Sequence, residues 1–200
     1  GYSAAQYVYG DAQTYVGYQA GLYSASGSNN TFLGYKAGKG ASVATANAGN
    51  SVAIGALALE NHTAPGNAVA IGYSAGNDIT TAQDTTIVGA YAGDEITTSE
   101  GNTIFGAHAG GEMKAGYHNT ILGSYGGYTM DTGRQNVIIG RTAGYEAQDV
   151  DMSVLIGYEA GYGTGDGMTS DADGAVAVGA RAGYDLLEGQ YQTAVGYGAL

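Results

Sequence analysis

Glycine recurs along this chain at a nearly constant interval, and this period limits the possible folds more than any other feature of the sequence. Of the ten intervals between eleven repeat glycines, eight are 17 residues long and the other two are 21 and 22. Such a period is typical of stacked repeats, in which one unit is too small to bury its own apolar face. The repeat glycines, which define position 0 of each repeat, are Gly17, Gly34, Gly55, Gly72, Gly89, Gly106, Gly123, Gly140, Gly157, Gly179 and Gly196.

The composition narrows the class of protein further. The 200 residues include 37 glycines and 18 tyrosines, but no cysteine, which excludes disulfides and thiolate metal sites. Because the glycines are periodic and accompany apolar runs, they indicate a repeat and not disorder. Eighteen acidic and six basic residues give a net charge of −12, which disfavours nucleic acids and anionic membranes as partners. No apolar run approaches the ~20 residues of a transmembrane helix, so we expect no membrane insertion.

The three residues before each repeat glycine form the second regular feature. Position −3 is always Thr or Val, position −2 is apolar and position −1 is large and apolar, as in Thr103-Ile104-Phe105. β-Branched residues suit a pleated strand, whereas a helix would lose about 1 kcal/mol at each interior glycine. The sequence therefore predicts an all-β fold, a parallel β-solenoid (β-roll) of about eleven 17-residue coils.

Each predicted strand is apolar on both faces. Side chains at −1 and −3 point to one face and the side chain at −2 points to the other. A coil of 17 residues encloses only one interior, so we expect a neighbouring chain to cover the second face. The small residues at 0, +3 and +4 predict a tight turn. An apolar residue at +7 predicts a second inward anchor, as at Ile79, Ile96, Met113, Met130 and Leu186.

Residues 1–200 are predicted to form a single β-solenoid domain. The two long intervals place their extra residues in connectors, at 39–49 and 162–173. The chain begins on a glycine near the repeat register and ends inside a repeat, at Gly198-Ala199-Leu200. We therefore expect it to be a segment of a longer fibrous chain.

Several copies of the motif resemble repeats of known surface proteins. Asn50-Ser51-Val52-Ala53-Ile54-Gly55 and residues 67–72 resemble the head repeat of trimeric autotransporter adhesins. Residues 30–38 and 102–110 are similar to related repeats in bacterial surface proteins and phage tail fibres. The resemblance implies a left-handed parallel β-roll with three chains side by side. The longer period and the Tyr-x-Ala-Gly continuation depart from those heads, and no functional residue carries over because the shared motif is structural.

Motifs that carry chemistry are scarce. Residues 72–76 match the nucleophile-elbow pattern G-x-S-x-G, but they are one copy of the structural repeat. The three histidines, His62, His108 and His118, share no repeat position, which favours structural or solvated roles. We therefore expect no catalytic residue and no enzymatic activity.

The acidic residues of one long connector are candidate metal ligands, because calcium prefers several oxygens on a flexible loop. The candidate calcium ligands are Asp166, Asp171 and Asp173, with weaker candidates at Asp149 and Asp151. A solvated acidic loop is the alternative, and no other cofactor is expected.

Tyrosine is the unusual excess. Five tyrosines share position +1 and four share +5, so stacked coils would align them in ladders. Such ladders suit packing against neighbouring chains or stacking on sugars. The regular Thr-x-Thr arrays of an ice-binding face are missing. The tyrosines at +1 are Tyr18, Tyr35, Tyr73, Tyr158 and Tyr197, and those at +5 are Tyr128, Tyr145, Tyr162 and Tyr184.

Taken together, these features predict a non-enzymatic structural or adhesive fibre segment, the head or shaft of a bacterial surface adhesin or phage tail fibre. Its expected location is extracellular, on a cell surface or virion. The expected partners are further copies of the chain, as a homotrimer, and a host-surface glycan or protein. The alternatives are a protomer of a self-assembling extracellular filament or sheath, a carbohydrate-binding module that uses the tyrosine ladders, and a polysaccharide-degrading β-helix enzyme.

Overall fold

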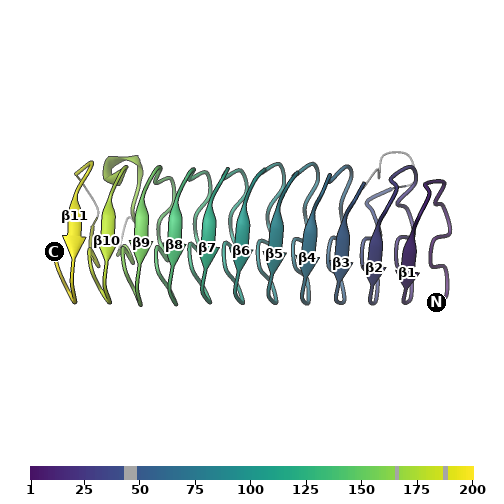
Figure 1. Cartoon of the computed structure of the whole chain (residues 1–200), viewed down its shortest axis with the longest axis horizontal. Helices are drawn as coiled ribbons and strands as arrows, with labels where there is room; N and C mark the ends of the chain where they lie inside the picture. The colour runs from purple at the N-terminus through teal and green to yellow at the C-terminus, as the bar shows by residue number, and fades with distance from the viewer. Residues whose placement is uncertain (43–48, 165–166, 187–188) are drawn as a thin grey trace.

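The computed structural model, which describes residues 1–42, 49–164, 167–186 and 189–200, is one parallel sheet wound into a β-solenoid of about ten turns. Eleven short strands lie side by side in sequence order along a rod, with the two termini at opposite ends (Figure 1). The predicted fold class is confirmed. The strands are β1 (Thr14–Val16), β2 (Thr31–Leu33), β3 (Val52–Ile54), β4 (Val69–Ile71), β5 (Thr86–Val88), β6 (Thr103–Phe105), β7 (Thr120–Leu122), β8 (Val137–Ile139), β9 (Val154–Ile156), β10 (Val176–Val178) and β11 (Thr193–Val195), and the 3₁₀ helix η1 (Ser170–Ala172) lies between β9 and β10.

Every strand occupies repeat positions −3 to −1 and pairs in parallel with the next strand. The register is constant, so that Thr103 lies opposite Thr120 and Ile104 opposite Ile121. The two long intervals keep the same register, because β2 pairs with β3 and β9 with β10 at equivalent positions. The extra residues therefore lie in the connectors, as predicted. Identical repeat positions thus form columns that run along the rod.

The interior is filled by a few of these columns. The middle residue of each strand from β2 to β11 is buried, and the residue at +3, alanine in most coils and Gly126 after β7, is buried beside it after β2 to β10. The predicted inward anchors at +7 are confirmed, since Ile79, Ile96, Met113 and Met130 are fully buried and Leu186 is nearly so. Burying an aliphatic side chain of this size contributes about 1.5–3 kcal/mol. The core is therefore one continuous strip that no single coil could form alone.

The repeat glycines make the turn that ends each strand. Their φ angles lie between +121° and +145°, a region that side chains disfavour. At Gly89, φ is +140° and an added Cβ would lie 2.3 Å from the carbonyl oxygen of Gly106 in the next coil. Glycine is therefore required for two reasons: the positive φ angle is strained for other residues, and the backbone of the next coil leaves no room for a Cβ atom.

The residues at position −4 form a buried polar column that the sequence analysis did not predict. The Asn119 side-chain oxygen accepts a hydrogen bond from the backbone N–H of Asn136 at 3.0 Å and another from the Asn136 side-chain amide at 3.1 Å. The Asn119 amide in turn donates to Asn102 Oδ1 and to the Gly133 carbonyl. Ser51 and Ser153 occupy the same position, and each hydroxyl accepts from the N–H one coil further on. The column satisfies buried backbone groups that the strands leave unpaired.

Candidate functional site

The outer face of the sheet is formed by the side chains at −3 and −1. In a single chain these residues are exposed or partly exposed, whereas the residue between them is buried. The side chain of Phe105 is 48% exposed and that of Val195 is 67% exposed. All residues at −1 are Val, Leu, Ile or Phe, and all those at −3 are Thr or Val. The chain itself therefore covers only one of the two apolar strand faces.

The absence of charge distinguishes this outer face from the rest of the surface. Eleven strands spaced by ~4.8 Å and each about 10 Å long give an area of roughly 500 Å². The largest exposed apolar patch of a typical monomer is about 300–600 Å². None of the 18 acidic and six basic residues lies in a strand. The outer face is thus a long, uncharged surface on a molecule with a net charge of −12.

Aromatic rings contact one another along the rod. One series is stacked throughout, and a longer one also contains tilted and edge contacts. Near the N-terminus, Tyr18 lies between Tyr2 and Tyr35, with ring centroids 5.7 and 5.4 Å apart. A longer run of eight rings in contact crosses the middle and C-terminal coils, with consecutive centroids 4.7–5.4 Å apart. Its members are Tyr73, Tyr91, His108, Tyr125, Tyr128, Tyr145, Tyr162 and Tyr184.

The five tyrosines predicted at +1 do not form one ladder. Tyr18 and Tyr35 stack, whereas Tyr73 makes an edge contact with Tyr91, which is at +2. Tyr158 has the guanidinium of Arg141 5.5 Å from its ring centroid, and Tyr197 is 81% exposed. Sugars stack on ring faces, and rings inside a stack cover each other's faces. The stacks therefore favour packing within the chain over glycan contact.

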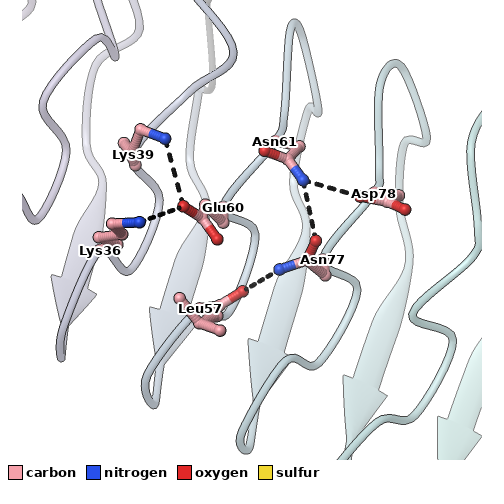
Figure 2. A network of polar contacts seen from close by, with 7 residues as sticks. All are labelled: Lys36, Lys39, Leu57, Glu60, Asn61, Asn77 and Asp78. Atoms are coloured by element: carbon pink, nitrogen blue, oxygen red, sulfur yellow. Dashed lines mark hydrogen bonds and ion pairs between the residues drawn. The ribbon is translucent and has the colours of Figure 1, made fainter.

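Polar side chains on the connectors link neighbouring coils. The Glu60 carboxylate forms ion pairs with both Lys36 and Lys39, with Nζ–Oε1 distances of 3.1 and 3.2 Å (Figure 2). Partial burial raises the pKa of Glu60, but its hydrogen bonds to the two ammonium groups outweigh this effect and hold the pKa below its usual value. Nearby, the Asn61 amide donates to Asn77 and Asp78 (Figure 2). These contacts fasten adjacent coils and offer no free reactive group.

A hollow of about 270 Å³ lies between connectors of the middle coils. Its walls are polar, and Lys114 lies 3.6 Å from Asp131 across it. Asp149 accepts a hydrogen bond from Thr132, so this carboxylate is engaged as well. The lining residues are Glu112, Lys114, Thr129, Asp131, Gln148 and Asp149.

The predicted calcium ligands are only partly brought together. Asp166 lies outside the described residues. Asp173 accepts a hydrogen bond from the backbone N–H of Asp151, and Asp151 accepts one from the N–H of Arg134. Asp171 lies in η1 with an exposed side chain. Within the described ranges, no three acidic or histidine side chains converge as metal ligands would. Calcium binding stays a prediction without geometric support in these ranges.

The other reactive-looking residues have structural surroundings. Ser74 is buried with a φ of +55°, and β4 is followed by a turn, where a nucleophile elbow would be followed by a helix. His108 is stacked between Tyr91 and Tyr125. His118 is exposed with a φ of +56°. The three histidines lie at three different repeat positions, so no column gathers them.

His62 is the exception, because its ring is fully buried at the inward position +7. Its Nε2 is 3.1 Å from the Gly38 carbonyl oxygen, to which it donates. Among the described residues, Nδ1 has no hydrogen-bond partner. Burial lowers the pKa of His62 from 6.5 to about 4, because a charged imidazolium would lose its hydration.

We expect the stability of the solenoid to fall by about 3 kcal/mol as the pH decreases from 6.5 to about 4, on account of this residue. Between pH 6.5 and about 4, His62 is protonated in the unfolded chain but not in the folded protein. Outside this pH range, His62 adds no pH dependence to the stability. His62→Ile, which introduces the residue found at Ile79 in the next coil, should remove this part of the slope. Urea unfolding at several pH values measures it, and equal slopes for both proteins would contradict the assignment.

Comparisons of the chain with known protein families, with curated proteins and with solved structures find no significant match. Across the part of the chain that the structure describes, no helix has the length and apolar character to cross a membrane.

Proposed function

We propose that this chain is a non-enzymatic structural segment of a fibre, in which copies of the rod pack side by side through their outer faces. The observation that carries the proposal is the uncharged face of Thr, Val, Leu, Ile and Phe side chains along eleven strands, which one chain leaves exposed or partly exposed. The resemblance to adhesin head and tail-fibre repeats supports an adhesive head or shaft of a bacterial surface adhesin or phage fibre. The proposal includes a location outside the cell, on a cell surface or virion, and assembly as a homotrimer.

Charge and spacing both favour another copy as the occupant of the outer face. Chains with a net charge of −12 repel one another, and their contact is least unfavourable where neither presents a charge. A second copy also presents side chains at the same spacing of ~4.8 Å, so ridges and grooves can match along the whole rod. A standard interface buries about 800 Å² per partner. Residues flanking the strands must therefore add to the roughly 500 Å² of the face itself.

A charge placed on the outer face tests this assembly. We expect light scattering of the native protein to give a multiple of the 20.0 kDa chain mass. Ile71→Glu, at position −1 of β4, should give single chains, because each copy would have to bury an unpaired carboxylate. The matched control is Thr98→Glu, which adds the same charge at an exposed connector position and should leave the assembly unchanged. A native protein of 20.0 kDa in solution would contradict the assembly.

The same measurements address the alternatives. Concentration-dependent polymers in electron micrographs would favour the self-assembling filament or sheath over a discrete fibre segment. Binding of the purified protein on a glycan array, lost on substitution of the exposed Tyr197, would favour the carbohydrate-binding module. The stacked tyrosines give that module little support, because their faces are already covered.

A further inference from the structure

The tyrosines at position +5 form an uninterrupted stack along four consecutive coils. The ring centroids of Tyr128 and Tyr145 are 5.3 Å apart, those of Tyr145 and Tyr162 are 5.2 Å apart, and those of Tyr162 and Tyr184 are 5.1 Å apart. The angles between the planes are 16°, 5° and 10°. All four side chains are partly exposed. Because the rings extend from equivalent positions, the ring carbon beside each hydroxyl lies near its counterpart in the next coil.

Tyrosine is also the side chain of this protein that a one-electron oxidant would oxidise. The chain has no cysteine and no tryptophan. Methionine is oxidised differently, by gain of an oxygen atom, and three of the four methionines, Met113, Met130 and Met168, are fully buried. Oxidising equivalents that reach the surface of the rod are therefore directed to the phenols.

We infer that the stack formed by Tyr128, Tyr145, Tyr162 and Tyr184 is a modification site, at which a peroxidase-type oxidant joins consecutive coils through dityrosine bonds. Each of two neighbouring phenols loses one electron and one proton. The two radicals join through a carbon–carbon bond between the ring positions next to the hydroxyls. The hydrogens on these carbons then move to the oxygens, which restores both aromatic rings. The two electrons and two protons released reduce one hydrogen peroxide to two waters at the peroxidase haem.

The surroundings of the stack suit this chemistry. Burial and the nearby carboxylate of Glu112 raise the pKa of Tyr128, and burial, Tyr145 and the carboxylate of Glu146 do the same for Tyr162. Both phenols are therefore protonated near neutral pH, and each has a carboxylate nearby to take the proton as the electron leaves. The product is a covalent link between coils in a chain that has no disulfides. Such links are internal to one chain, so they form whether or not copies assemble.

Tryptic peptides make the links directly visible. The chain is cut after Lys114, Arg134, Arg141 and Arg181 around the stack. A link between Tyr128 and Tyr145 joins peptide 115–134 to peptide 142–181. A link between Tyr162 and Tyr184 joins peptide 142–181 to peptide 182–200. Treatment of the dilute protein with a haem peroxidase and hydrogen peroxide should give both joined peptides in mass spectra, while the intact chain loses only the two hydrogens of each link and forms no covalent dimer.

Conservative variants assign the links. Tyr145→Phe keeps an aromatic ring in the stack, so the fold should persist by circular dichroism. The joined peptide of 115–134 and 142–181 should fall to background, whereas the joined peptide of 142–181 and 182–200 should remain. Tyr191→Phe is the control, because this exposed ring makes no stacking contact with the described residues. Joined peptides that survive Tyr145→Phe, that disappear in Tyr191→Phe, or that form in equal yield from urea-unfolded protein would overturn the inference.

Discussion

Alanine in place of Gly89 is expected to destabilise the solenoid by about 4 kcal/mol, a large effect for the addition of one methyl group. The φ of Gly89 is +140°, which is strained for any residue with a side chain. The added Cβ would also lie 2.3 Å from the carbonyl oxygen of Gly106 and 2.6 Å from its carbon. These atoms belong to the backbone of the next coil, so they can move only if the stacking of the two coils is disturbed.

Gly66→Ala is the matched control for this substitution. Its Cβ would have its nearest neighbour at 3.7 Å, in the side chain of Gln83, which is an ordinary contact. We therefore expect Gly66→Ala to change stability by less than about 1 kcal/mol. Urea unfolding followed by circular dichroism compares the two, and hydrogen exchange shows whether the damage is centred on β5 and β6. Equal losses for both variants would show that the period does not reflect the close approach between coils.

The period allowed the strands to be predicted closely from the sequence. The residues before each repeat glycine, such as Thr103-Ile104-Phe105, form strands at the expected positions, and Ile79 and Ile96 are buried at +7 as predicted. These predictions succeeded because stacking repeats the same local environment in every coil. A preference that is weak in one copy becomes reliable when eleven copies agree.

Other features of the surface could not be read from the repeat alone. The tyrosine stack at +5 was predicted, but the continuation from Tyr128 to Tyr125, at +2, was not. The +2 residues have φ angles near +55°, as at Tyr91 and Tyr125, which turns their rings toward the neighbouring column. The burial of His62 was not specified either, because the sequence left structural and solvated roles open for the histidines. At +2 the side-chain direction depends on a turn geometry that residue types alone do not specify, whereas His62 is a polar residue at +7, a position that is apolar in neighbouring coils.

The outer face links the fold to the proposed function. The regularity of this rod distributes similar groups evenly along its length. Of the two most regular outward columns, that at −1 is apolar and that at −3 consists of Thr and Val, and neither carries a charge. A surface of this kind is suited to a long, uniform contact, which is what a fibre made of parallel rods requires.

The buried asparagine column is expected to be about as sensitive to substitution as the repeat glycines. Asn119→Leu should destabilise the protein by about 3–5 kcal/mol, because it leaves buried polar groups without partners. The backbone N–H of Asn136 would lose its acceptor, and the carbonyl of Gly133 would lose the donor now 2.8 Å away. The extra apolar surface of leucine does not compensate, since an unpaired buried polar group costs about 1–3 kcal/mol.

Asn119→Ser separates the loss of hydrogen bonding from the loss of volume. Serine already occupies this position at Ser153, where its hydroxyl accepts from the N–H of Ala175 at 3.0 Å. Asn119→Ser should therefore keep the acceptor for Asn136 and cost less than half as much as leucine, although serine is smaller. Urea unfolding of both variants decides the order, with exchange of the Asn136 amide as a local measure. If serine were the more damaging substitution, packing volume and not hydrogen bonding would control this column.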